Sequence, residues 1–277
     1  MTHHENPSKA EREESRQAET EQSMPVGPAV AAAAGSSPNG GSPEPTPAEP
    51  NPAEPEGQRP GPRATLDREL RSVKDDVLRL GALVEEALER AGKALTERDT
   101  ELADRVRWDD AEVNDLQRRV SNEIAVALAT QQPMARDLRE LLALYHAAAE
   151  LERMGDYAVN IAKLAQQLAS EPEIPIFTQL PLMERLCRSQ LHAAMRALVD
   201  VSEADARAVC ANDDELDRLY DAVYRSAMEL MQSDPSRVPQ ATHLLFVAHH
   251  LERLGDRVTN IGEDVVYLAT GQIEDLN

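Results

Sequence analysis

The sequence predicts an all-α protein made of two pseudo-symmetric three-helix bundles that follow a disordered N-terminal tail. Three observations support this fold class. Apolar residues recur at three- and four-residue steps through most of residues 65–272, a segment at 151–161 returns at 251–261, and residues 1–64 have a composition of their own. Such steps place apolar side chains on one face of an α-helix, and a repeated segment indicates an internal duplication.

The expected tail, residues 1–64, is poor in the residues that build a core. It holds 12 of the 18 prolines and none of the eight aromatic residues, and it is rich in Glu, Ser, Ala and Gly. A segment of this composition cannot bury enough apolar surface to offset the loss of chain entropy on folding. We therefore expect a disordered tail.

Six long helices are expected after the tail. In the first half they cover approximately residues 66–95, 100–130 and 133–170, and in the second half approximately 182–201, 204–231 and 239–269. A linker at 171–181 contains three prolines and no helical periodicity, and no stretch alternates as a half-buried strand does. The expected domains are a first bundle at 65–171 and a second bundle at 178–272.

The charge of the chain is strongly negative, with a formal net charge of −21 at pH 7. No face collects Lys and Arg without interleaved acids, which argues against nucleic-acid binding. An acidic body suits cations or a protein partner with a basic face. There is no run of 18 apolar residues and no charged-then-apolar leader, so we expect a cytoplasmic protein that reaches a membrane only through protein partners.

The repeated segment carries the strongest functional pattern. Leu151–Ile161 and Leu251–Ile261 are identical at seven of eleven positions. A weaker sequence similarity links the preceding helices of the two halves: Asp110 and Asn114 in the first half correspond to Asp213 and Asp217 in the second. The two halves therefore share acidic residues on two helices each.

Within the repeat, carboxylates lie one helical turn apart. Glu152 and Asp156 share one helix face, as do Glu252 and Asp256 in the second copy, although like charges at this spacing repel each other. A mid-helix glycine in each copy costs about another 1 kcal/mol relative to alanine. Grouped oxygen atoms suit a hard cation. The alternative is structural, with the glutamates paired to arginines of neighbouring helices and the glycines only tightening the packing.

Other reactive side chains give weaker patterns. His249 and His250 precede the second acidic pair, but Ala149 and Glu150 stand at the corresponding positions of the first copy. We therefore expect these two histidines to be half-buried residues of a helix rather than metal ligands. The two cysteines, at 187 and 210, are expected to be reduced thiols, in the core or half-buried, and a chain of this size does not need the alternative, a disulfide between them. Core packing is also expected for the aromatic residues on helical stripes, Trp108, Tyr145, Tyr157 and Phe246.

The sequence does not favour an enzyme. The folded part has no Glu-x-x-His spacing of di-metal bundles, no glycine-rich phosphate loop, and no serine with a readable base. A non-enzymatic regulatory adaptor is the leading hypothesis. The alternatives are a metal-dependent phosphohydrolase and a purely structural helical scaffold.

Several motifs resemble those of the PhoU family. They are Leu-Glu-Arg-Met-Gly-Asp at 151–156, Leu-Glu-Arg-Leu-Gly-Asp at 251–256, Asn-Ile-Gly-Glu-Asp-Val-Val-Tyr at 260–267 and Gln-Gln-Pro at 131–133. The resemblance implies two three-helix bundles and a negative regulator of phosphate uptake and of phosphate-starvation signalling. It implies two partners, the ATPase subunit of a phosphate ABC transporter and a phosphate-sensing histidine kinase. Apart from the resemblance, apolar residues left over on the long helices are compatible with a homodimer.

The resemblance further implies a metal cofactor, Fe, Zn, Mg or Mn, held by E(D)XXXD motifs on the bundles. Asn114 stands where the family pattern has a stronger carboxylate ligand, so the two sites are expected to differ. Carried over by position, the metal ligands would be Asp110, Asn114, Glu152, Asp156, Asp213, Asp217, Glu252 and Asp256.

Overall fold

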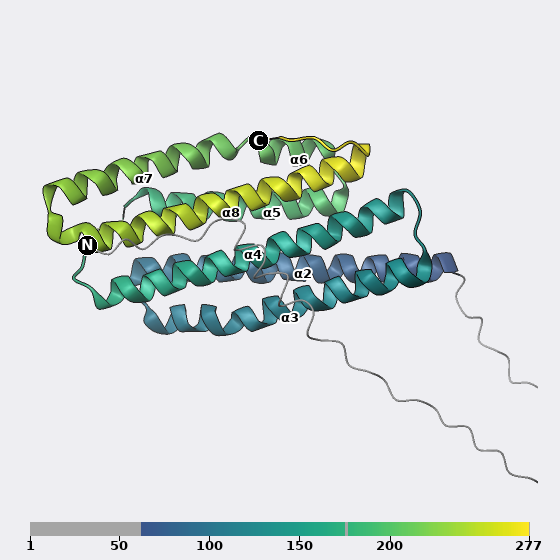
Figure 1. Cartoon of the computed structure of the whole chain (residues 1–277), viewed down its shortest axis with the longest axis horizontal. Coiled ribbons are helices and arrows are strands. Elements are labelled where there is room, and N and C mark those ends of the chain that lie inside the picture. Colours follow the sequence, from purple (N-terminus) through teal and green to yellow (C-terminus); the bar gives the residue numbers. More distant parts are fainter. Residues whose placement is uncertain (1–61, 175–176, 277) are drawn as a thin grey trace, which may run out of the picture. The chain divides into compact units, whose positions relative to one another are not determined.

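All regular structure in the described part of the chain is helical, as the predicted fold class requires (Figure 1). The structure is a computed structural model that describes residues 62–174 and 177–276, apart from the side chains of Pro62 and Asp213. The expected tail lies outside the described residues up to position 61. Residues 175 and 176 of the expected linker also lie outside them.

The first half contains three helices that pack on one another: α2 (Pro62–Glu97), α3 (Thr100–Gln131) and α4 (Arg136–Ser170). Their bounds lie within a few residues of those expected from the periodicity. The side chain of Asp99 accepts a hydrogen bond from the Leu102 amide at 2.9 Å and so caps the start of α3.

The second half has the same order of helices with one more interruption. Its elements are α5 (Gln179–Asp200), α6 (Glu203–Cys210), α7 (Asp213–Ser233), the 3-10 helix η1 (Pro235–Arg237) and α8 (Val238–Thr270). The prolines at 235 and 239 fit the first turn of a helix, where the missing amide hydrogen is not needed.

The continuous helix expected at 204–231 is wrong, because the chain breaks between α6 and α7. The Asn212 side chain donates a hydrogen bond to the Ala208 carbonyl at 2.9 Å, and the Asn212 carbonyl accepts one from Gln190 at 3.1 Å. These two hydrogen bonds satisfy the Ala208 and Asn212 carbonyl groups at the bend between α6 and α7. The three acids that follow, at 213–215, favour a new helix start because they lie at the positive end of its dipole.

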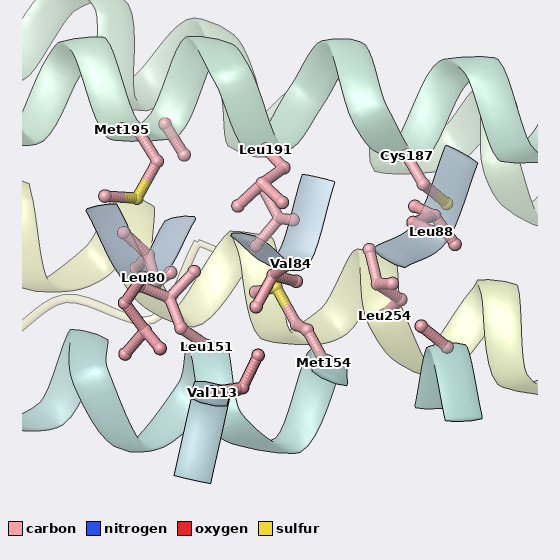
Figure 2. Close-up of a cluster of buried hydrophobic side chains, with 14 of the residues drawn as sticks. Leu80, Val84, Leu88, Val113, Leu151, Met154, Cys187, Leu191, Met195 and Leu254 are labelled. Atoms are coloured by element: carbon pink, nitrogen blue, oxygen red, sulfur yellow. The ribbon is translucent and has the colours of Figure 1, made fainter. Parts of the chain in front are cut away.

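The hydrophobic core is continuous from one half to the other. Helix α2 packs against α3, α4 and α5, while α8 packs against α4, α5, α6 and α7. The buried side chains shown in Figure 2 therefore come from both halves; among them are Leu80, Val84, Leu88, Leu151, Met154, Leu191 and Leu254.

The contact between α4 and α8 is the most extensive in the described part of the chain. Three pairs show that the two helices are antiparallel, since residues early in one meet residues late in the other: His146 with Asp264, Glu150 with Arg257, and Tyr157 with His250. In Figure 1, α3 lies beside α4, and α7 lies beside α8. The repeated segments thus meet near the middle of this contact.

The expected core positions of three aromatic residues are wrong. Trp108 is 80% exposed, Tyr145 48% and Phe246 51%, whereas Tyr157 is partly buried against the core. The reason is helical phase: Trp108 follows the buried Val106 by two residues, which turns it about 200° away. A long helix can therefore carry a row of apolar residues that does not face the core.

The close approach of α8 to α6 gives a stability prediction. A Cβ atom at Gly262 would lie 2.5 Å from Cys210 Sγ and 3.4 Å from the Ala206 carbonyl. Gly262→Ala should therefore lower the free energy of unfolding by about 1–3 kcal/mol, despite the better helix propensity of alanine. Urea unfolding followed by circular dichroism measures this.

Two further variants control this comparison. Cys210→Ala in the Gly262→Ala background should restore part of the loss, because it removes the clashing sulfur atom. Gly81→Ala should cost less, since its Cβ would meet only the flexible end of Met195, at 3.0 Å. A Gly262→Ala variant as stable as the wild type would contradict the packing described.

Candidate functional site

The first acidic centre comprises Asp110 and Asn114 on α3 with Glu152 and Asp156 on α4. Asn114 Nδ2 donates a hydrogen bond of 2.7 Å to Asp110 Oδ2. Burial and the charge of Asp156 raise the pKa of Asp110. Burial and the charges of Asp156 and Asp110 raise the pKa of Glu152. The acids expected from the two helices thus come close enough to repel one another.

Gly155 allows α3 to pack closely on α4 at this centre. A Cβ atom at Gly155 would lie 3.1 Å from Val113 Cγ1 and 3.6 Å from Asp110 Oδ1. The first contact is tight and the second is ordinary, so packing against Val113 is the main demand for glycine. A cavity of about 170 Å³ lies beside Asp110 and Gly155. The glycine thereby brings the Asp110 carboxylate against the backbone of α4.

The second acidic centre comprises Asp217 on α7 with Glu252 and Asp256 on α8; the side chain of Asp213 lies outside the described ones. Burial and the charges of Asp256 and Asp217 raise the pKa of Glu252. Burial also raises the pKa of Asp256, although Arg253 and Arg257 oppose it. Glu252 Oε2 is buried and accepts no hydrogen bond within the described part of the chain.

The second centre has neighbours that the first lacks. His249 Nδ1 lies 3.5 Å from Glu252 Oε2, and burial together with the Glu252 charge raises the pKa of the Tyr220 phenol. In the sequence similarity between α3 and α7, Gln117 corresponds to Tyr220. Sequence comparison of the halves could have found Tyr220 by this difference. His250 is half-buried and stacks on Tyr157 with ring centroids 5.8 Å apart.

The structural alternative for the repeat holds only in part. Among the described ion pairs, none joins Glu152 or Glu252 to an arginine. Arg153 pairs instead with Glu150, and Arg253 lies 3.3 Å from Asp256. The packing role of Gly155 is real, but the expected neutralisation of the glutamates by neighbouring arginines is absent in this part of the chain. Packing therefore accounts for the glycine of the first copy but not for the two glutamates.

A buried glutamate next to the first repeat was not found from the sequence. The side chain of Glu150 is 1% exposed, and its carboxylate pairs with Arg153 and with Arg257 Nη1, the latter at 3.3 Å. Asn260 Nδ2 also donates to it, at 3.3 Å. Nearby, His146 Nδ1 lies 2.6 Å from Asp264 Oδ2, and this carboxylate is the largest cause that raises the pKa of His146. These contacts join the two halves.

The chemistry of the two centres fits a cation better than a reaction. Their donors are mainly carboxylate oxygens, which hard ions prefer, and Glu252 Oε2 accepts no hydrogen bond within the described residues that a cation would have to displace. Among the described side chains, no three from Asp, Glu, His and Cys lie close enough together to hold an ion as they are placed. Binding of a cation would require rotation of these side chains.

Two helical halves with one acidic face each define the class: a duplicated helical-bundle protein with paired acidic centres. A family model described as "PhoU domain" matches residues 77–165 and 180–265, which lie in the two halves. The chain belongs to the PhoU family.

Relatives match across nearly their whole length. The chain is 33% identical over 216 residues to a "Phosphate-specific transport system accessory protein PhoU homolog" of Clostridium acetobutylicum, covering 78% of this chain and 99% of the relative. A homologue of the same description from Xylella fastidiosa is 35% identical over 206 residues, covering 74% and 85%.

Solved structures agree with the fold. The phosphate transport system regulatory protein PhoU from Streptococcus pneumoniae superposes with a TM-score of 0.72 at 32% identity, covering 76% of this chain and 99% of that one. PhoU from Pseudomonas aeruginosa gives 0.73 at 31% identity, covering 75% and 100%. None of the helices in the described residues combines the length and the hydrophobicity that a membrane span requires.

The repulsion within the first centre gives a pH prediction. A carboxyl group whose pKa is raised by folding destabilises the folded state once it is ionised. Glu152→Gln should therefore raise the free energy of unfolding at pH 7 by a few tenths of a kcal/mol, the usual scale for an exposed like-charge pair. The gain should vanish as the pH falls through the raised pKa towards about 4, because Glu152 is then protonated in both states.

Urea unfolding at several pH values measures this difference, with Glu229→Gln as the control. Glu229 is exposed on α7, outside both centres, and its substitution should change stability little at either pH. Equal stability of wild type and Glu152→Gln at pH 7 would show that the centre carries no net repulsion.

Proposed function

We propose that this chain is an accessory protein of a phosphate-specific transport system and works as a non-enzymatic cytoplasmic adaptor. The observation that carries this proposal is the pair of acidic centres on duplicated bundles, in a chain that covers 99% of a relative named for that system. An adaptor needs stable surfaces rather than a pocket with a base and an open coordination position. The two outward acidic faces supply such surfaces.

The adaptor connects two partners. One is the ATPase subunit of a phosphate ABC transporter, and the other is a phosphate-sensing histidine kinase. When phosphate is plentiful, the chain holds transport down and keeps the kinase from signalling starvation, so it is a negative regulator. The net charge of −21 supports partners with basic contact surfaces. It also disfavours close self-association through the acidic faces.

The acidic centres bind divalent or trivalent cations, Mg, Mn, Fe or Zn. In the first centre the ligands are Asp110, Asn114, Glu152 and Asp156. In the second they are Asp213, Asp217, Glu252 and Asp256, and a cation there would offset the mutual repulsion of the carboxylates. Asn114 gives the first centre one charged ligand fewer, so it binds a given cation more weakly than the second.

Partner capture tests the adaptor. The tagged chain is purified from its own cells grown at high and at low phosphate, and the recovered proteins are identified by mass spectrometry. The transporter ATPase subunit should be enriched at high phosphate by about fivefold or more, the lower range of a regulatory coupling. Cells that lack the chain should also take up more phosphate in phosphate-rich medium. Recovery of neither the ATPase subunit nor a sensor kinase above an untagged strain would refute the adaptor.

Metal content tests the cation centres. The untagged wild type should contain metal and should gain thermal stability when Mn²⁺ or Mg²⁺ is added, by about 2.7 kcal/mol at 100 times the dissociation constant. The double variant Glu152→Ala/Glu252→Ala should lose both effects. The control Glu101→Ala/Glu229→Ala removes the same charge from exposed positions of α3 and α7 and should keep them. Equal metal content and equal stabilisation in both double variants would exclude these centres.

A further inference from the structure

One face of α4 carries apolar side chains in its first part and the first acidic centre further along. Leu138, Leu142 and Tyr145 follow one another at steps of four and three residues, and Glu152 and Asp156 continue the same row. At 100° per residue these five positions fall within an arc of about 80°. From Leu138 to Asp156 the row is about 27 Å long at 1.5 Å per residue. We call Leu138, Leu142 and Tyr145 the α4 strip.

The α4 strip is exposed, although the helix has a separate core face. Leu138 is 37% exposed, Leu142 43% and Tyr145 48%, whereas Leu141 and Leu144 between them are buried. Scattered exposed apolar residues are common on protein surfaces, but consecutive ones on one helix face indicate a surface that another molecule covers.

The equivalent row in the second half shows that the fold does not require the strip. The positions of α8 that correspond to the three strip residues hold Val238, which is 41% exposed, Thr242 and Leu245. Thr242 is polar and donates its hydroxyl hydrogen bond to the Val238 carbonyl at 2.7 Å, and Leu245 is partly buried against the core. Both halves keep the acidic residues, but only the first half presents a continuous apolar row. The α4 strip is thus a property of one half.

We propose that the α4 strip and the first acidic centre together form a docking surface for a basic amphipathic helix of a partner protein. Such a helix would lay its apolar residues on the α4 strip and its Lys or Arg residues beside Glu152 and Asp156. This deepens the proposed adaptor function by naming the chemistry of a partner segment. It depends on that function only in requiring that a protein partner exists.

Charge complementarity selects this occupant. Among the described ion pairs, none joins Glu152 to an arginine, since Arg153 pairs with Glu150. The whole chain has a net charge of −21, so a second copy would bring like charge against like charge. A basic helix brings the opposite charge. The apolar contacts supply most of the binding energy, while the charges fix the direction of the bound helix and speed its association.

A synthetic peptide provides the probe. It is about 18 residues long, which matches about 27 Å of helix, with leucines at four- and three-residue steps in one half and lysines in the other half. Its affinity for the full chain is measured by fluorescence anisotropy in a buffer with a chelator, so that the carboxylates stay free of cations. The triple variant Leu138→Ser/Leu142→Ser/Tyr145→Ser should bind it about tenfold more weakly or worse.

The matched control is Leu182→Ser/Val199→Ser on α5. These residues are 45% and 42% exposed, and α5 makes its main contacts with α2, α6, α7 and α8 rather than α4. This control should bind the peptide within about twofold of the wild type. If the triple variant fails to fold by circular dichroism, the single variant Leu142→Ser replaces it. Because Leu142 is the central residue of the α4 strip, the expected loss is about threefold, which is half of the free energy of a tenfold effect.

In the peptide assay, two outcomes would overturn the proposal. One is equal affinity of the wild type and the strip variant. The other is equal binding of a peptide with the same composition in scrambled order, since this would mean that charge alone attracts it. The adaptor function is judged separately by partner capture. A strip variant that still recovers its partners at wild-type levels contradicts the docking surface alone. A wild type that recovers neither the ATPase subunit nor a sensor kinase, but recovers another protein that the strip variant loses, contradicts the adaptor alone.

Discussion

The contact between α4 and α8 holds the two halves in one arrangement, and a single buried carboxylate lies at its centre. Glu150 is 1% exposed and is paired with Arg153 of its own helix and Arg257 of the other. A buried charge that loses its partners is strongly destabilising, so the pairing restricts how the helices can sit against each other. Both arginines belong to the repeated segments, each next to an acid of its centre. The same segments therefore join the halves and present the carboxylates.

Because the halves are duplicated, each contact of this interface has an equivalent pair of positions elsewhere in it. The residues at the two equivalent pairs differ. The ion pair of Glu150 with Arg257 has as its counterpart the stacked pair of His250 with Tyr157, since the positions exchange between the halves. An exposed His146 likewise corresponds to Phe246. Because the two places are no longer interchangeable, the halves have distinct surfaces. One half can carry an exposed apolar strip without the other needing it.

The sequence predicted most of the fold because long helices depend on local periodicity, which a single chain displays. It missed the break at Asn212, where contacts with Gln190 and Ala208 outweigh a nearly continuous pattern. It also misplaced Trp108, because periodicity finds a stripe but not which stripe faces the core. The acidic positions could be found since the repeat shows them twice. Glu150 could not, because its partner Arg257 lies 107 residues away and the second copy has histidine in its place.

The metal ion and the basic helix that we propose for the first centre would contact the same oxygen atoms. Burial, and after it the charges of neighbouring acids, raise the pKa values of Glu152 and Asp110. A cation would offset the repulsion among these carboxylates. A metal ion and the basic end of a docked helix would both gain from their negative charge. If each uses the carboxylates of Glu152 and Asp156, the binding of one weakens the binding of the other by the same factor, as linkage requires. The apolar part of the α4 strip lies outside this competition, since a metal ion gains nothing there. A centre of this kind can therefore adjust the affinity for a partner through cation supply while the identity of the partner stays fixed by the strip.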